Sequence, residues 1–284
     1  MSTSFSTLIS ATALAGHLDD PNWRIVDCRH DLANTRFGRA AYEDGHLPGA
    51  VFAHLDEDLS SPPNGRNGRH PLPDPQLLAA RFGAWGIDDG TQMVAYDDAG
   101  GMYAARLWWL LRWLGHERVA VLDGGYQAWC RTAKVLTAEI PTPTPRRFDA
   151  RVQKGAVDAD ALQAGLAGGE VLLIDARSPD RFRGENETLD PVGGHIPGAV
   201  NHFFRNNLRD DGCFKEAAAL REEFGRILGG RQATKVVHQC GSGVTACLNL
   251  LAMEAAGLCG SRLYPGSWSE WCADRGRPVA TGPA

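Results

Sequence analysis

The sequence predicts two tandem α/β domains, each built on a mainly parallel sheet. Three observations support this fold class. The chain repeats itself in order, its short apolar runs alternate with longer helical patterns, and a proline-rich segment separates the two copies. With 284 residues, the chain is long enough for two domains of ordinary size.

Four pairs of segments recur in the same order along the chain, which is not plausibly chance. The pairs are "RIVDCR" (Arg24–Arg29) with "LLIDAR" (Leu172–Arg177), "GHLPGAV" (Gly45–Val51) with "GHIPGAV" (Gly194–Val200), Met93–His116 with Lys235–Leu258, and "DGGYQAW" (Asp123–Trp129) with "PGSWSEW" (Pro265–Trp271).

The two copies meet at "TAEIPTPTPRRF", which spans Thr137–Phe148. Its alternating prolines exclude a helix and favour an extended, stiff tether. We therefore expect a first domain over residues 1–136, a linker over 137–149 and a second domain over 150–284.

Within the first copy, short apolar runs read as strands buried on both faces. These runs are Arg24–Asp27, Met93–Tyr96 and Val119–Leu122. The helical pattern of Tyr103–Leu114 stops at Gly115 and its counterpart stops at Gly257, and glycine suits the end of a helix. Proline, glycine and asparagine mark Ser60–Pro75 as a loop. Alternating strands and helices imply a parallel sheet.

The composition excludes several classes of function. A net charge of −5 argues against general affinity for nucleic acid or an anionic membrane surface. No apolar stretch is long enough for a membrane span, because Arg106 and Arg112 interrupt the richest one. The first 23 residues contain no Lys or Arg, unlike a secretory signal or a transit peptide, so the expected location is the cytoplasm.

Seven cysteines are present, an odd number with irregular spacing and no CxxC motif. This pattern argues against a disulfide scaffold and against a zinc site, so most of them should be small buried residues. Cys240 differs because it follows a predicted strand, Lys235–Gln239, and precedes a helix that starts near Thr245. Cys247 lies inside that helix and should be an ordinary buried residue.

A cysteine at the carboxyl end of a parallel strand lies where α/β proteins bind their ligands. Gly241 and Gly243 permit a tight loop that turns N–H groups toward Cys240, and these dipoles with the helix N-terminus stabilise a negative sulfur. Cys240 is therefore a candidate nucleophile. The first copy lacks this chemistry: the positions of Cys240, Ser242 and Thr245 hold Asp98, Gly100 and Tyr103.

The double copy, both "GH[LI]PGA" motifs and "CGSGVTA" resemble the two-domain rhodanese-like sulfurtransferases over essentially the whole chain. The loop looks like that of the 3-mercaptopyruvate branch, because the thiosulfate branch usually has basic residues where this chain has Gly241 and Ser242. The resemblance implies a five-stranded parallel sheet flanked by helices in each domain. It also implies that only the second domain is catalytic and that the active site lies between the domains.

The resemblance further implies that Cys240 takes a sulfane sulfur from the donor as a persulfide and passes it to a thiol, thioredoxin or cyanide. No metal or organic cofactor is expected. Alternatives are a thiosulfate:cyanide sulfurtransferase and a non-enzymatic module for sulfur relay or binding. A phosphatase of the same fold is excluded, because Ala246 stands where its loop would need an arginine.

The same resemblance assigns Ser242 and His46 to a proton relay, although His195 repeats His46 and favours a structural role equally. Arg181 matches one of two arginines that bind the donor carboxylate, and the second is missing. Arg183 is close by, and either arginine could instead be a solvated loop charge.

The loop residues Gly241, Gly243, Val244 and Thr245 are expected to line the substrate site. Together with Ser242 they form a neutral segment after the cysteine. A dianion such as thiosulfate would need fixed cations there, so the sequence favours 3-mercaptopyruvate as the donor.

Overall fold

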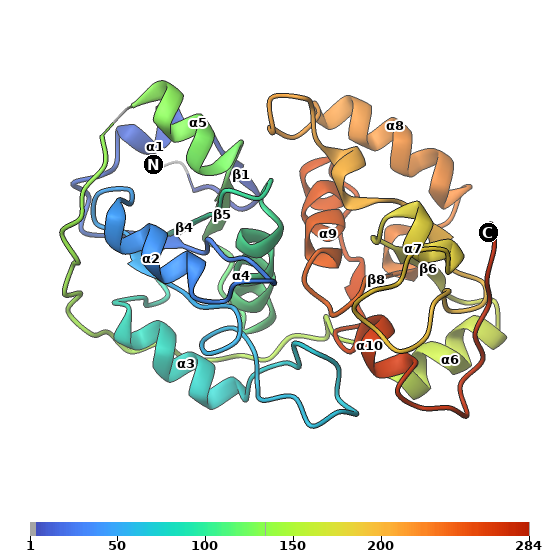
Figure 1. Cartoon of the computed structure of the whole chain (residues 1–284). Coiled ribbons are helices and arrows are strands. Elements are labelled where there is room, and N and C mark those ends of the chain that lie inside the picture. Colours follow the sequence, from blue (N-terminus) through green and yellow to red (C-terminus); the bar gives the residue numbers. More distant parts are fainter. Residues whose placement is uncertain (1–3, 134, 284) are drawn as a thin grey trace. The chain divides into compact units, whose positions relative to one another are not determined.

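The computed structural model describes residues 4–133 and 135–283, and the chain divides into two compact units (Figure 1). Unit 1 comprises Met1–Ser61, Pro73–Lys154 and Asp210–Phe214, and unit 2 comprises Pro62–Leu72, Gly155–Arg209 and Lys215–Ala284. Two short segments thus group with the other copy. The first of them brings Arg69 and His70 into unit 2.

Unit 1 is built on a five-stranded sheet with the order β1-β5-β4-β2-β3, and every strand pair is parallel. The strands are β1 (Leu8–Ile9), β2 (Trp23–Asp27), β3 (Val51–Phe52), β4 (Gln92–Tyr96) and β5 (Val119–Leu122). The helices are α1 (Ala11–Ala15), α2 (Phe37–Asp44), α3 (Pro75–Ala84), α4 (Met102–Trp113) and α5 (Gly125–Thr132).

Unit 2 has a parallel sheet with the order β7-β6-β8-β9. Its strands are β6 (Leu172–Asp175), β7 (Val200–Asn201), β8 (Val236–Gln239) and β9 (Arg262–Leu263). Its helices are α6 (Ala159–Ala167), α7 (Pro179–Arg183), η1 (Phe204–Asn207), α8 (Ala217–Leu228), η2 (Ala233–Lys235), α9 (Ala246–Ala255) and α10 (Ser267–Trp271).

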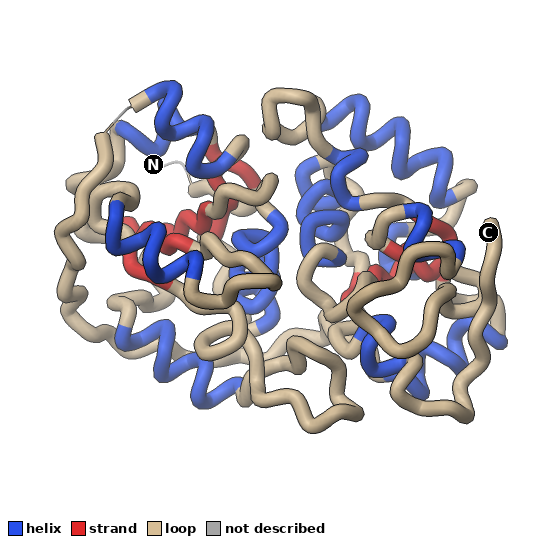
Figure 2. The backbone as a smooth tube through the Cα atoms, viewed as in Figure 1, coloured by secondary structure: helices blue, strands red, loops and turns tan. Residues whose placement is uncertain are grey.

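The family resemblance implied five strands in each sheet, and in the described residues unit 2 has four. Ala156 replaces the fifth strand: it forms a single parallel bridge with Leu263, beside β9, as β1 lies beside β5 in unit 1. The predicted fold class of two parallel-sheet α/β domains is confirmed. In Figure 2 the strands of each unit lie among its helices, and each unit has a hydrophobic core of its own.

The predicted elements lie close to their expected limits. The predicted strands correspond to β2, β4, β5 and β8, and the predicted helices correspond to α4 and α9. Gly115 and Gly257 follow these helices with φ of 87° and 72°, the left-handed conformation that glycine adopts most readily. The predicted loop ends at Asp74, because Asp74 caps α3 and Pro75 is its first residue.

One buried ion pair in each unit joins the repeated motifs. Arg29 pairs with Asp27 at 2.6 Å and donates to the carbonyl of Gly45 at 2.7 Å. Arg177 pairs with Asp175 at 2.7 Å and donates to the carbonyl of Gly194, also at 2.7 Å. The repeated Asp-x-Arg motif therefore holds the turn that begins each "GH[LI]PGA" motif.

None of the helices in the described part of the chain combines the length and apolar character that a membrane crossing requires.

Candidate active site

Cys240 lies at the carboxyl end of β8, where the sequence places it. Its backbone N–H donates to Ser267 Oγ at 3.1 Å, and its carbonyl accepts from the N–H of Trp268 at 3.0 Å. Cys247 is fully buried in α9, with Sγ 3.4 Å from the carbonyl of Gly243. The predicted contrast between a loop cysteine and a helix cysteine is confirmed.

The other cysteines follow the expectation of burial only in part. All seven are free thiols. Cys28 and Cys272 are buried like Cys240 and Cys247, whereas Cys130 and Cys213 are half-buried and Cys259 is exposed.

Ser267 anchors the strand end that carries Cys240, and sequence reasoning missed it. Its φ is 54°, a left-handed conformation that costs a non-glycine residue free energy. The hydroxyl accepts from Cys240 and donates to the carbonyl of Tyr264 at 2.9 Å. The matching residue of the first repeat is Gly125, with φ of 56°. The serine in a glycine position was the available signal.

The loop after Cys240 needs the glycine at position 243. Gly243 has φ of 77°, and a Cβ there would lie 2.3 Å from the carbonyl oxygen of Pro265. Gly101, its counterpart in unit 1, has φ of 87°. The predicted tight loop is therefore present in both units.

The corresponding loop in unit 1 closes around an anion of its own. The carboxylate of Asp97, the residue after β4, accepts backbone N–H groups at 2.8–2.9 Å. These donors belong to Ala99, Gly101, Tyr103 and Ala104. The loop geometry thus directs N–H groups toward one negative group. In unit 2 the position of Asp97 is taken by Gln239, a neutral amide.

Two guanidinium groups border the loop after Cys240 at Gly241. A Cβ on this glycine would lie 2.8 Å from Arg69 Nη2 and 3.4 Å from Arg181 Nη2. The loop itself is neutral, as the sequence indicates, but two arginines border it, and Arg69 was not expected there. Sequence reasoning missed Arg69 because it lies in the Ser60–Pro75 loop, about 170 residues before Cys240 in the chain. Nothing local in "NGRH" marks it.

Both arginines already have carboxylate partners. Arg181 binds Glu187 through Nε at 3.0 Å and Nη2 at 2.9 Å, and it lies 3.4 Å from Asp190. Arg69 forms an ion pair with Asp190. Burial tends to raise the pKa of Glu187, but the N–H of Leu189 and the Arg181 guanidinium outweigh it and lower that pKa. Two cations and two carboxylates therefore nearly cancel beside the loop.

A third arginine, Arg177, is within electrostatic reach of the sulfur. Burial tends to lower the pKa of Arg177, but the charges of Asp175, Glu187 and Cys240 outweigh it and raise that pKa. Since Arg177 also has its own carboxylate, Asp175, it changes the local net charge little.

Ser242 forms a hydrogen bond with a histidine that sequence reasoning did not single out. Ser242 Oγ lies 2.7 Å from Nδ1 of His70, and each residue is only 6 % exposed. When Nδ1 carries no proton, it accepts from the hydroxyl and makes Ser242 a better proton carrier. The predicted Ser242 thus has an imidazole partner inside unit 2.

His46, the histidine expected beside Ser242, supports a turn of unit 1. Its Nδ1 lies 2.6 Å from the carbonyl of Tyr42, and its Nε2 lies 3.1 Å from the carbonyl of Glu139. His195 repeats this arrangement, with Nδ1 2.8 Å from the carbonyl of Phe182. These contacts favour the structural alternative for both histidines.

Three residues expected at the substrate site remain: Val244 and Thr245 lie at the start of α9, and Arg183 lies near the surface. Val244 and Thr245 begin the first turn of α9, where their carbonyls accept the N–H groups of Cys247 and Leu248 at 3.0 and 3.1 Å. Arg183 pairs with Glu185 at 2.6 Å near the surface. Such an exposed pair contributes little to stability, and substrate binding by Arg183 stays a prediction.

A profile of the Rhodanese-like domain matches residues 10–132 and 158–274. The chain belongs to the rhodanese-like domain family. It is 46 % identical over 282 residues to a Pseudomonas aeruginosa protein named "Probable 3-mercaptopyruvate sulfurtransferase", covering 98 % of this chain and 99 % of that one. It is 34 % identical over 265 residues to the thiosulfate sulfurtransferase of Rattus norvegicus, covering 88 % and 85 %.

Among solved structures, this rhodanese-like chain superposes on the 3-mercaptopyruvate sulfurtransferase from Leishmania major with a TM-score of 0.85. The identity is 30 %, over 96 % of this chain and 76 % of that chain. The resemblance stated from the sequence is confirmed, and so is the expectation of a transferase that moves sulfur. These two relatives are named for different sulfur donors, so the donor used by this chain has to be inferred from the geometry of the site.

Proposed function

We propose that this rhodanese-like protein transfers sulfane sulfur from 3-mercaptopyruvate to a thiophilic acceptor through a persulfide on Cys240. The observation that carries the proposal is the loop after Cys240, which has two arginines beside Gly241 and a Ser242–His70 hydrogen bond. The arginines suit a carboxylate and the Ser–His pair suits a proton transfer. The P. aeruginosa relative carries the same substrate in its name.

In the first half-reaction, the Cys240 thiolate attacks the donor sulfur and forms an S–S bond. The carbon–sulfur bond breaks, and its electron pair stays on the donor carbon as the enolate of pyruvate. Proton transfer to that carbon gives pyruvate. In the second half-reaction a thiol, thioredoxin or cyanide attacks the outer sulfur and releases the thiolate. The persulfide is covalent, so this sequence of steps requires no cofactor.

Arg69 and Arg181 are proposed to hold the donor carboxylate. A planar guanidinium binds a carboxylate through two parallel hydrogen bonds, and both groups border the loop at Gly241. Glu187 and Asp190 occupy them in the substrate-free protein. A nearly neutral cluster of this kind accepts a monoanion more easily than the dianion thiosulfate, because less uncompensated charge is brought in. This balance supports 3-mercaptopyruvate over thiosulfate.

Ser242 and His70 are proposed to deliver the proton that converts the enolate to pyruvate. The enolate formed when sulfur leaves needs a proton donor, and the Ser242 hydroxyl borders the nucleophile in sequence. His70 at 2.7 Å would supply the next proton to Ser242. This assignment replaces His46 in the relay inferred from the sequence.

The persulfide is tested by intact-mass measurement after treatment with the donor. Wild-type protein should gain the mass of one sulfur, and Cys240→Ser should gain none and lose all transfer activity. Cys247→Ser is the matched control, since it removes a buried thiol from the same region, and it should keep the added sulfur and most activity. Sulfur gained by Cys240→Ser would contradict the assignment.

The donor is tested separately by comparing kcat/KM for 3-mercaptopyruvate and thiosulfate on one preparation with cyanide as acceptor. The proposal expects the higher value for 3-mercaptopyruvate. A higher value for thiosulfate would overturn the donor while leaving transfer through Cys240 intact. Failure of both donors, with the protein folded, would favour a binding module.

A further inference from the structure

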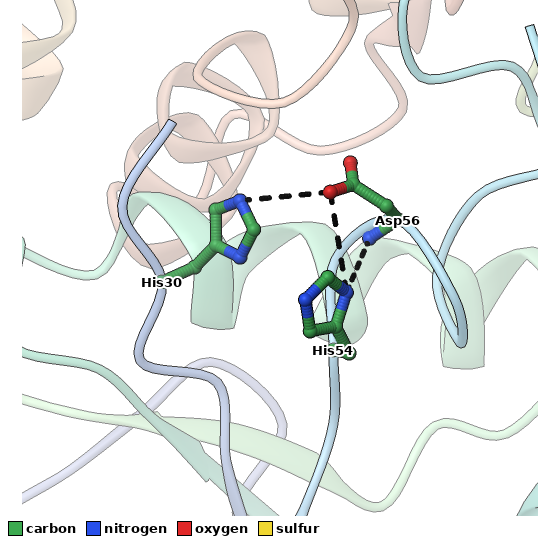
Figure 3. Close-up of side chains that lie close together, drawn as sticks. All are labelled: His30, His54 and Asp56. Atoms are coloured by element: carbon green, nitrogen blue, oxygen red, sulfur yellow. Dashed lines mark hydrogen bonds and ion pairs between the residues drawn. The ribbon is translucent and has the colours of Figure 1, made fainter. Parts of the chain in front are cut away.

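The carboxyl edge of the sheet in unit 1 carries two imidazoles and a carboxylate that face one another (Figure 3). His30 follows β2, and His54 and Asp56 follow β3. One oxygen of Asp56 lies 4.0 Å from Nε2 of His30 and 4.0 Å from Nδ1 of His54. The three ligand atoms all lie within 4.8 Å of one another. We propose that this cluster binds one Zn²⁺ ion, with its remaining coordination positions open to water or a small anion.

The hydrogen bonds of His54 leave Nδ1, the nitrogen that lies 4.0 Å from Asp56, as the one that can bind the ion. Nε2 lies 2.9 Å from the carbonyl of Thr35, and a carbonyl only accepts, so Nε2 carries the proton and Nδ1 carries the lone pair. Metal-binding histidines commonly have their second nitrogen fixed by a carbonyl in this way. The N–H groups of Asp56 and Glu57 approach Nδ1 at 3.1 and 3.3 Å. The metal would replace these two long contacts.

The cluster needs only a small contraction to reach zinc geometry. Zinc binds histidine nitrogen and carboxylate oxygen at about 2.0–2.2 Å, so tetrahedral ligand atoms lie roughly 3.4 Å apart. The two 4.0 Å separations therefore have to shorten by less than about 1 Å, and the two imidazole nitrogens, within 4.8 Å of each other, have to approach by up to about 1.4 Å. Asp56 can supply the first movement because its side chain is 41 % exposed, and the second requires the ring of His54 to move toward His30. His30 is held in place by edge contacts with the rings of His54 and Tyr103.

The site also has access from solvent. A pocket of about 400 Å³ reaches His54 and Asp56, which gives an ion a route from solvent. Two arginines, Arg36 and Arg39, also line this pocket, but Arg39 pairs with Glu57 at 3.0 Å.

The internal repeat shows that the ligand set is specific to unit 1. Strand pairing aligns Asp27 and Phe52 in one unit with Asp175 and Asn201 in the other. Counting from these pairs, His30, His54 and Asp56 correspond to Ser178, Phe203 and Arg205. The unit that carries the catalytic cysteine has therefore none of the three ligands. The unit without the cysteine has all of them at the same edge of its sheet.

This site is independent of sulfur transfer through Cys240. The sequence argument against zinc concerned cysteine ligands, and the cluster contains no cysteine. Its chemistry resembles zinc sites with three protein ligands, in which an open position holds water or a substrate. The metal would therefore give unit 1 a ligand-binding capacity of its own.

The experiment is a Zn²⁺ titration of the full-length protein by calorimetry, after chelator treatment, desalting and alkylation of accessible thiols. Wild type should bind one equivalent. Asp56→Asn keeps the side-chain shape and should weaken binding by at least about 100-fold, since it removes a direct ligand. Glu43→Gln is the matched control: it removes the same charge from another residue of the pocket and should leave the affinity unchanged. His30→Phe keeps the ring packing and should also abolish binding.

The ring nitrogens give a second readout in ¹⁵N spectra. Zn²⁺ should shift Nε2 of His30 and Nδ1 of His54 and leave the nitrogens of His46 unshifted. The melting temperature of each variant identifies any loss of binding that comes from unfolding. Absence of saturable binding to wild type would overturn the proposal. Equal affinity in the wild type and a folded Asp56→Asn variant, or shifts confined to other histidines, would overturn it as well.

Discussion

Replacing Arg69 by alanine should raise KM for 3-mercaptopyruvate far more than it lowers kcat. A hydrogen bond to a charged group contributes about 1.5–3 kcal/mol, which corresponds to about a ten- to hundredfold loss in kcat/KM. The donor carboxylate keeps its charge throughout the reaction, so the lost interaction is equal in the ground and transition states and appears mainly in KM. The value should lie toward the upper end. Without Arg69, Asp190 has Arg181 as its partner, at 3.4 Å, and competes with the substrate for it.

The assay is the initial rate of pyruvate formation over a range of donor concentrations. Arg226→Ala is the matched control, because it removes an arginine of the same unit that pairs with Glu222 on the exposed surface of α8. Discharge of a preformed persulfide by cyanide involves no donor carboxylate and should be unaffected by Arg69→Ala. Equal losses in the two variants, or an equal loss in the discharge step, would refute the carboxylate assignment.

Two further predictions concern the loop of unit 1 and the histidines. Burial, followed by the charge of Asp97, raises the pKa of Asp98 from 3.8 to about 6, so Asp98 lowers stability progressively as the pH rises through this interval. Asp98→Asn should raise the melting temperature at pH 7.5, lose most of this gain near pH 3, where Asp98 is largely protonated in both states, and leave kcat unchanged. His70→Ala should lower kcat about a hundredfold by removing the partner of Ser242. His46→Ala should leave kcat intact and cost about 1 kcal/mol of stability, since the buried carbonyl of Tyr42 loses its contact with the imidazole. The reverse pattern in rates and melting curves would restore His46 to the relay.

The fold was predictable because the sequence patterns that mark strands and helix ends are local, and because they occur in both repeats. The internal repeat predicted two sheets, and buried apolar runs such as Met93–Tyr96 predicted the limits of strands to within a residue. Glycines marked helix ends because only they adopt the required φ cheaply. The β1-like strand of unit 2 was the exception, since its place is taken by a single bridge at Ala156.

The site was predictable only where its residues are neighbours in the chain. Cys240 and its glycines could be identified because the loop is continuous. Arg69 and His70 could not, because a loop far away in sequence brings them to Gly241 and Ser242. His46 and His195 illustrate a second difficulty, because a repeated motif can mark a shared turn as easily as shared chemistry.

The carboxylate that fills the loop of unit 1 also bears on how the two repeats could have diverged. Asp97 and Asp98 stand where the loop of unit 2 has Gln239 and Cys240, so a loop of the second kind in unit 1 would require changes at both positions. Asp98→Cys alone would place a thiolate beside a carboxylate that already accepts the four N–H groups, so two anions would compete for the same donors. Asp97→Gln alone would leave these N–H groups without an anion to bind. Each single change loses an interaction before the second is made, which favours keeping the two loops different after a duplication.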